Sequence, residues 1–299
     1  MHKPARLCLV LLSIGAVALI TGPTGAGADD QPNATANPTC GGISIPKADG
    51  GTWTCTFDDE FNGTGLDRST WNVETTAASR LTGGAACFLD TPQNVSVADG
   101  TLNLTVRKQA QPIPCTSSKG TTMTDYTSGM VDTFGTFAQA YGRFQVRAKL
   151  PATAIQGLQE SFWLWPQNPQ AYGPVWPMSG EIDIAESYSR YSDHMIPYVH
   201  YLSLGLDPNV TSYGCGVPDI DQFHTYTAVW DPTSITISYD GKTCITDNWG
   251  LLGASGGQPF NQSFMIALTQ ALGIGKNAFI PGTTPLPATT SIDYVRVWK

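Results

Sequence analysis

Short runs of alternating apolar and polar residues fill the chain from Trp53 to Trp298 and limit its fold more than any other feature. Examples are residues 102–106, 234–239 and 292–297, and Gly, Pro, Asn and Asp separate such runs. A period of two between turn residues is typical of β-strands. No amphipathic helix longer than two turns and no internal repeat is apparent. The pattern therefore predicts an all-β protein, most simply a two-sheet sandwich.

The first 50 residues differ in composition from the rest. Residues 1–28 have the form of a secretory signal peptide, with basic residues before an apolar run and small residues at the end. The apolar run is short for a membrane span, so we expect an exported protein with no membrane partner. Residues 29–50 are rich in Asn, Pro, Gly and Thr, and we expect a flexible leader tied down at Cys40. We expect residues 51–299 to form a single domain.

Six cysteines remain once the signal peptide is set aside: Cys40, Cys55, Cys87, Cys115, Cys215 and Cys244. An even number in an exported chain predicts three disulfides, and six cysteines allow 15 pairings. We expect sequential pairing, which joins 40 to 55, 87 to 115 and 215 to 244. No Cys-x-x-Cys or His-rich spacing suggests a metal site.

The formal charge of −8 becomes −10 when the signal peptide, with Lys3 and Arg6, is removed. Nucleic acid is an unsuitable partner because the chain has no basic patch. A strongly anionic polysaccharide is only mildly disfavoured, since a local cleft can differ from the net charge. Eight Trp and 11 Tyr suit a sugar binder, although they equally suit a large core. Nothing in the sequence argues against a monomer.

Three carboxylates fall within the six residues from Glu181 to Glu186, although acidic residues are depleted from strands. Alternation places Glu181 and Asp183 on one face, and Ile182 and Ile184 on the other. Glu186 lies five positions from Glu181, so a regular strand would turn it away. One extra residue in a β-bulge returns Glu186 to the face of Glu181 and Asp183.

Two carboxyls on one face can hydrolyse a glycosidic bond. A separation of about 5–5.5 Å favours a nucleophile with an acid/base and retention, whereas roughly 6.5–9.5 Å admits a water molecule and favours inversion. The sequence gives no distance. The alternative is an exposed acidic strand on an outer sheet face.

The surrounding motifs carry a resemblance to a known family. Phe162-Trp-Leu-Trp lies one hairpin before the carboxylates, and Trp176-Pro-Met-Ser-Gly leads into them. Together with Glu-x-Asp-x-x-Glu, these motifs resemble glycoside hydrolase family 16, in its laminarinase branch. Five-residue spacing without a bulge marks the lichenases and xyloglucan enzymes. Further similarity in Asp59-Glu-Phe, in the strand from Tyr141 and in Asp293-Tyr-Val-Arg-Val extends the resemblance over about residues 56–299.

The resemblance implies a concanavalin-like β-jelly roll of two bent antiparallel sheets with a concave substrate groove. It also implies that Glu181 is the nucleophile, Glu186 the general acid/base and Asp183 the residue that tunes the pair. The expected activity is retaining endo-hydrolysis of neutral, laminarin-type β-1,3-glucan outside the cell. Mixed-linkage glucan, galactan or transglycosylation would suit the same carboxylates, and a non-catalytic glycan-binding jelly roll is a further alternative. The chain departs from the family pattern at residues 159–161 and 268–273, which leaves subsite preference open.

Four further residues are candidates for substrate binding. Trp163 and Trp165 share a strand face and would form sugar platforms if they face the groove, or core if they face inward. Trp176 would form the floor of a sugar subsite or would pack against the rest of the protein. His200 would lie at the edge of the cleft or have a purely structural role.

No cofactor is expected to be required. The resemblance makes a structural calcium near Asp293 and Glu60 an option, but calcium prefers six to eight oxygen ligands and too few can be named. Arg147 is expected to be structural, holding carboxylates of the sheet or loops.

Overall fold

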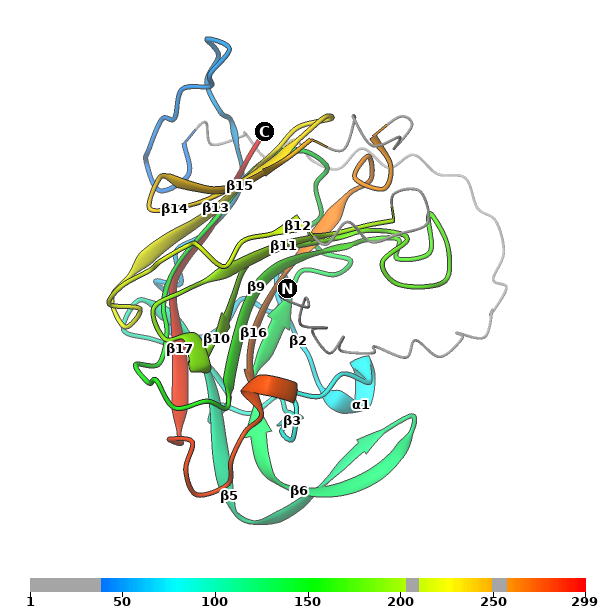
Figure 1. The fold of residues 1–299 in the computed structure, drawn as a ribbon, viewed down its shortest axis with the longest axis vertical. Coiled ribbons are helices and arrows are strands. Elements are labelled where there is room, and N and C mark those ends of the chain that lie inside the picture. Colours follow the sequence, from blue (N-terminus) through cyan, green and yellow to red (C-terminus); the bar gives the residue numbers. More distant parts are fainter. Residues whose placement is uncertain (1–38, 203–209, 249–256) are drawn as a thin grey trace, which may run out of the picture.

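Two sheets contain all the strands of the part of the chain that the structure describes (Figure 1). The structure is a computed structural model, and it describes residues 39–202, 210–248 and 257–299. The ten-stranded sheet contains β1 (Cys55–Asp59), β3 (Cys87–Phe88), β4 (Val95–Ala98), β5 (Thr101–Ser117), β6 (Gly120–Ser128), β8 (Gly142–Lys149), β13 (His224–Trp230), β14 (Ile235–Tyr239), β15 (Lys242–Asp247) and β17 (Ala288–Trp298). The seven-stranded sheet contains β2 (Asn72–Val73), β7 (Met130–Asp132), β9 (Leu158–Pro166), β10 (Glu181–Tyr188), β11 (Ile196–His200), β12 (Val210–Thr211) and β16 (Phe264–Leu272).

Strand order and bending match the predicted jelly roll. The smaller sheet has the order β12-β11-β10-β9-β16-β7-β2, and both sheets are bent (Figure 1). Pairing is antiparallel except between β3 and β6, which run parallel. The Cys87–Cys115 disulfide ties β3 to β5, beside this exception. The helical elements are short: α1 (Thr76–Ser79), and the 3-10 turns η1 (Ser189–Tyr191) and η4 (Gly275–Asn277).

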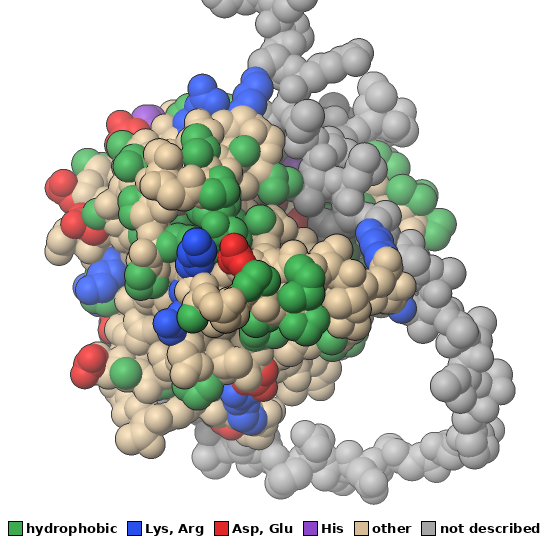
Figure 2. All heavy atoms as spheres, turned by 90° about the horizontal axis from the view of Figure 1, so that it is seen from below, with side chains coloured by type: hydrophobic (Ala, Val, Ile, Leu, Met, Phe, Trp, Pro, Cys, Tyr) green, Lys and Arg blue, Asp and Glu red, His purple; other side chains and the backbone are tan. Residues whose placement is uncertain are grey.

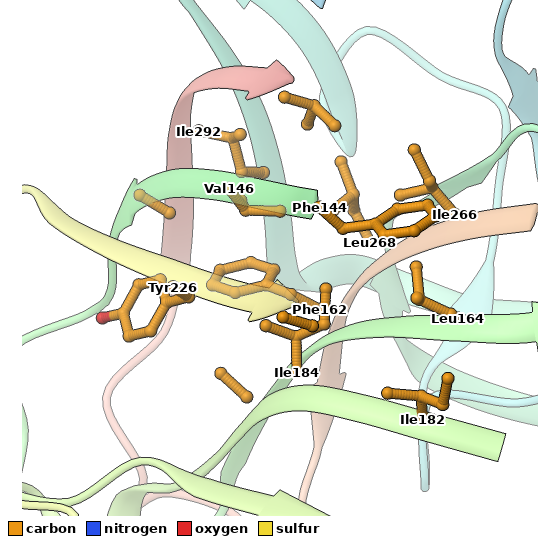
Figure 3. Packing of buried hydrophobic residues seen from close by; sticks show 14 of the residues in the cluster. Phe144, Val146, Phe162, Leu164, Ile182, Ile184, Tyr226, Ile266, Leu268 and Ile292 are labelled. Atoms are coloured by element: carbon orange, nitrogen blue, oxygen red, sulfur yellow. The ribbon is translucent and has the colours of Figure 1, made fainter. Parts of the chain in front are cut away.

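The main core lies between the two sheets. Alternation on β9 and β10 sends Phe162, Leu164, Ile182 and Ile184 into this space, and each is at most 1% exposed (Figure 3). Burial of each such side chain stabilises the fold by about 1.5–3 kcal/mol. The residues between them on both strands therefore face away from the core, and this outer face of the smaller sheet is where the candidate site lies.

The disulfide prediction is confirmed for two pairs and wrong for the third. Cys40–Cys55 and Cys87–Cys115 are bonded, whereas Cys215 and Cys244 are free thiols. Burial raises the pKa of Cys244, and the neighbouring Cys215 raises it further. Because the thiolate is the form that exchanges disulfides, both effects disfavour the reactive form of the Cys244 side chain.

The N-terminal part of the described chain is attached to the last strand. Cys40 is fully buried and packs with Cys55 and Trp298, and the backbone of Thr54 exchanges hydrogen bonds with that of Lys299. The predicted signal peptide and residues 29–38 of the predicted leader lie outside the described residues. Within the described residues, no helix has the length and apolar character needed to cross a bilayer.

Candidate active site

A β-bulge in β10 brings the three carboxylates to one sheet face. On the β9 side, Asp183 pairs with Trp163 and Ala185 with Phe162, so two steps on β10 match one on β9. The β11 side shows the same single extra residue between Asp183 and Glu186. Ile184 and Ala185 are both buried, and Glu186 therefore returns to the outer face. The predicted bulge is confirmed.

Three side chains donate hydrogen bonds to the Glu186 carboxyl. Tyr188 Oη lies 2.8 Å from Oε2, while Gln159 Nε2 and Ser161 Oγ lie 3.2 and 3.3 Å from Oε1. Burial raises the pKa of Glu186. The hydrogen bond from Tyr188, the charge of His200 and the bonds from Gln159 and Ser161 oppose that rise. The three hydrogen bonds thus hold the carboxyl in one orientation, and the effects on its pKa act in opposite directions.

Asp183 is buried between the two glutamates. Its side chain is 6% exposed, and Oδ2 lies 3.5 Å from Nε2 of His200. Burial raises the pKa of Asp183 well above its usual range, and the charges of Glu181 and Glu186 raise it further. Three neighbouring carboxyls cannot all ionise easily, so the titrations of Asp183 and the two glutamates are coupled.

An aromatic wall borders Glu181. Trp176 donates from Nε1 to Glu181 Oε2 at 2.5 Å. The Trp176 ring lies 5.0 Å from that of His200, which stacks on Tyr198 at 5.3 Å and 9°. Trp176 and His200 therefore both lie beside the carboxylates.

Comparison with known proteins identifies the family. The model of "Glycosyl hydrolases family 16" matches residues 84–250, more than half of the chain. The chain belongs to glycosyl hydrolase family 16. It is therefore a glycoside hydrolase that acts on O-glycosyl bonds.

Two relatives and one solved structure illustrate the likeness. The chain is 31% identical over 267 residues to "Glucan endo-1,3-beta-glucosidase A1" of Niallia circulans, covering 81% of this chain and 37% of that protein. It is 30% identical over 266 residues to "Glucan endo-1,3-beta-glucosidase" of Cryptopygus antarcticus, covering 83% of this chain and 93% of that protein. The laminarinase catalytic domain of Thermotoga maritima MSB8 superposes with a TM-score of 0.69 at 27% identity, over 83% of this chain and 98% of that one. The chain thus spans little more than a third of the first relative and nearly all of the second.

Trp163 and Trp165 lie on the carboxylate face of this family 16 chain. Both are half-buried, their rings are 5.8 Å apart in an edge contact, and Trp163 Nε1 donates to Thr269 Oγ1 at 3.0 Å. They pack on a small apolar cluster that includes Met265, separate from the main core. Their outer faces are therefore available on the same surface as Glu186.

Gln159, Ser161 and Tyr188 are site residues that the sequence analysis did not identify. Gln159 and Ser161 alternate with Trp163, so their shared face was readable from the period of two. Their contact with Glu186 depends on the register of β9 against β10, in which Ser161 pairs with Glu186 and Gln159 with Tyr188. Sequence alone gives no access to that register.

The carboxylates named for calcium do not fit a calcium site. Glu60 accepts two hydrogen bonds from Arg296, at 2.6 and 2.9 Å, and Asp293 forms an ion pair with Arg147 at 2.5 Å. Arg147 also lies 4.8 Å over the Phe223 ring, consistent with the structural role expected for it. Each carboxylate already has a cationic partner that a calcium ion would have to displace.

Proposed function

We propose that the chain is a secreted endo-hydrolase of neutral, laminarin-type β-1,3-glucan that retains anomeric configuration. The observation that carries the proposal is the bulged strand, which puts Glu181, Asp183 and Glu186 on one outer face with Trp176 and aligned side chains of β9. Both relatives described above are named as glucan endo-1,3-beta-glucosidases, which supports the choice of linkage.

The proposed reaction has two displacements. Glu181 attacks the anomeric carbon while Glu186 gives its proton to the leaving oxygen, so that the glycosidic bond breaks and a glycosyl ester forms. Glu186, now ionised, takes a proton from water, and the resulting hydroxide displaces Glu181. The raised pKa of Glu186 suits the first step, because the group must enter the reaction protonated. Asp183, held near His200, tunes the charge on the pair.

The aromatic residues would hold the glucan. Trp163 and Trp165 present ring faces beside Asp183 on which pyranose rings can stack, and Trp176 would form part of the subsite at Glu181. His200 would border the same subsite, since its ring lies against Trp176. The proposal needs no cofactor.

An exported monomer acting on a neutral polysaccharide fits the remaining features. The predicted signal peptide and the two disulfides suit an oxidising compartment. The face in Figure 2 shows acidic and basic side chains scattered among polar and apolar ones, without the basic tract that nucleic acid would require.

Hydrolysis of a soluble β-1,3-glucan by wild type and by Glu181→Gln tests the proposal. We expect the variant to lose roughly a thousandfold or more of the wild-type kcat, as happens when a catalytic nucleophile is removed. Glu60→Gln is the matched control. It makes the same Glu-to-Gln change at a carboxylate that pairs with Arg296, so this variant should keep the wild-type activity. Equal activity in wild type and Glu181→Gln would remove the mechanism.

Departures from the family pattern near Glu186 leave other substrates and outcomes open. Residues 159–161 and 268–273 depart from the family pattern, and they lie on paired strands at the site, where Gln159 and Ser161 contact Glu186. Mixed-linkage glucan, galactan or a sugar acceptor in place of water would use the same carboxylates. Product sizing by mass spectrometry over a polysaccharide panel separates these outcomes, and binding without turnover would indicate a glycan-binding protein.

A further inference from the structure

A pocket opens at the end of β10, directly beside Glu186. Gln159 and Tyr188 line it, and both donate hydrogen bonds to the Glu186 carboxyl. The pocket is therefore continuous with the proposed acid/base. On the Glu181 side, the comparable neighbours are Trp176 and His200.

The position of the acid decides which part of a substrate would enter this pocket. A general acid must come within about 2.6–3.2 Å of the oxygen that it protonates. The sugar that departs with that oxygen must then lie beside the Glu186 carboxyl. The pocket lies on that side of the carboxyl, since Gln159 and Tyr188 belong to both.

The walls of the pocket suit a sugar ring. Four tyrosines line it: Tyr188, Tyr191, Tyr198 and Tyr213. Tyr191 and Tyr213 are 42% and 48% exposed, and the hydroxyls of Tyr198 and Tyr213 are 2.8 Å apart. Such residues offer an apolar face together with a polar tip, which matches the two kinds of surface on a pyranose.

The charges of the pocket have the opposite sign to that of the chain as a whole. Arg190 and Lys276 line it, and none of its described lining residues is a carboxylate. Arg190 Nη1 donates to the carbonyl of Lys276 at 2.9 Å, which ties the two cationic residues together. Acidic groups near the pocket are Glu186, which Gln159 and Tyr188 contact, and Asp193 of the adjoining loop, whose Oδ1 lies 2.5 Å from His194 Nδ1. Two cations on one wall can attract an anion locally even where the net charge, here −8, would repel it.

We propose that this pocket binds the sugar of the leaving group and that Arg190 and Lys276 favour a sulfate or carboxylate on that sugar. The inference rests on the proposed function, because it takes Glu186 as the acid. It adds a substrate feature: a neutral glucan unit on the Glu181 side and an acidic substituent on the leaving side.

Oligosaccharides that differ only in the leaving unit test this. They share a neutral β-1,3-glucan portion and end in glucose, glucose 6-sulfate or glucuronic acid. We expect wild type to cleave an acidic form with a kcat/KM about two- to fivefold above that of the neutral form. This factor corresponds to the free energy of one exposed ion pair, and it should arise mainly from a lower KM. The preference should disappear in about 1 M salt. A preference for only one of the two acidic forms also supports the proposal and identifies the substituent.

Charge reversal supplies the second arm. Lys276→Glu should invert the preference toward the neutral substrate, because it replaces a cation of the pocket wall with an anion that repels an acidic leaving unit. Lys242→Glu, an equally exposed change on β15 in the other sheet, should keep the wild-type preference. Glucose 6-sulfate added as a product should inhibit wild type more than Lys276→Glu.

Failure of the pocket proposal and failure of the proposed function would give different results. Equal kcat/KM for the three substrates in a working enzyme overturns the pocket proposal and leaves the glucanase proposal standing. Failure to cleave any of them, together with inactivity on long β-1,3-glucan, overturns the proposed function itself.

Discussion

Glu186 owes its properties to neighbours on two strands. Burial raises its pKa, while the hydrogen bonds from Tyr188, Gln159 and Ser161 favour the ionised form. These effects oppose one another, which suits the role we propose for Glu186, first as acid and then as base. Removal of a donor therefore changes the pH dependence of the reaction as well as its rate.

Tyr188→Phe is expected to move the alkaline limb of the kcat/KM profile to higher pH. The variant loses the donor 2.8 Å from Glu186 Oε2, so the pKa of the acid rises and the protonated form persists to higher pH. Initial rates across a pH series measure the limb. Tyr126→Phe, which removes a hydroxyl remote from β10, is the control and should leave the profile in place. An unchanged limb in Tyr188→Phe would show that Glu186 does not set it.

At the scale of the element, the bulge in β10 was predictable and its partners were not. The spacing of Glu181, Asp183 and Glu186 requires one extra residue if all three are to share a face, and Ile184 with Ala185 provides it. The alternation of apolar residues likewise predicted the strands. The contacts of Gln159 and Ser161 depend on inter-strand register, which no local pattern records.

The same limit applies to other sites. Gln270 donates to Glu160 at 2.8 Å across 110 residues of sequence, so the two segments that depart from the family pattern come into contact only through the fold. Two of the three sequential disulfides followed from order alone, but Cys215 and Cys244 remain thiols. The carboxylates of Glu60 and Asp293 are held by arginines, a choice of partner that composition does not reveal.

Deleting Ala185 should leave part of the glucan hydrolysis intact. The deletion removes the bulge, and the period of two then still places Glu181, Asp183 and Glu186 on the outer face. Activity on a soluble β-1,3-glucan, measured beside a check that the variant is folded, tests this. A folded deletion variant with no activity would show that the bulge does more than bring the three carboxylates to one face.

At the scale of the whole molecule, a buried carboxyl links the two sheets. Glu160 on β9 is 2% exposed and accepts a hydrogen bond from the Gln270 side chain on β16. The side-chain amide oxygen of Gln270 in turn accepts from Thr290 Oγ1, on β17 of the other sheet, at 2.7 Å. Burial raises the pKa of Glu160 to about 7 from its ordinary 4.5. Folding therefore favours the protonated form. Its contribution to stability is complete below about pH 4.5 and is lost as the pH rises through 7.

Glu160→Gln should flatten the pH dependence of stability. A shift of this size corresponds to on the order of 3 kcal/mol, so the variant should gain that much relative to wild type between pH 4.5 and pH 8. The amide can still accept from Gln270, which limits other effects. Denaturant unfolding at both pH values measures the change. A constant difference between variant and wild type at the two pH values would show that Glu160 does not titrate in the folded protein.

The assignment of Glu181 as the nucleophile can be read out directly by trapping the glycosyl ester. A 2-deoxy-2-fluoro glucosyl donor with a good leaving group slows the second displacement, and peptide mass spectrometry then locates the attached sugar. We expect a stable adduct on Glu181 and a retained configuration in the products released from ordinary substrate. An adduct on Glu186, or products of inverted configuration, would contradict it.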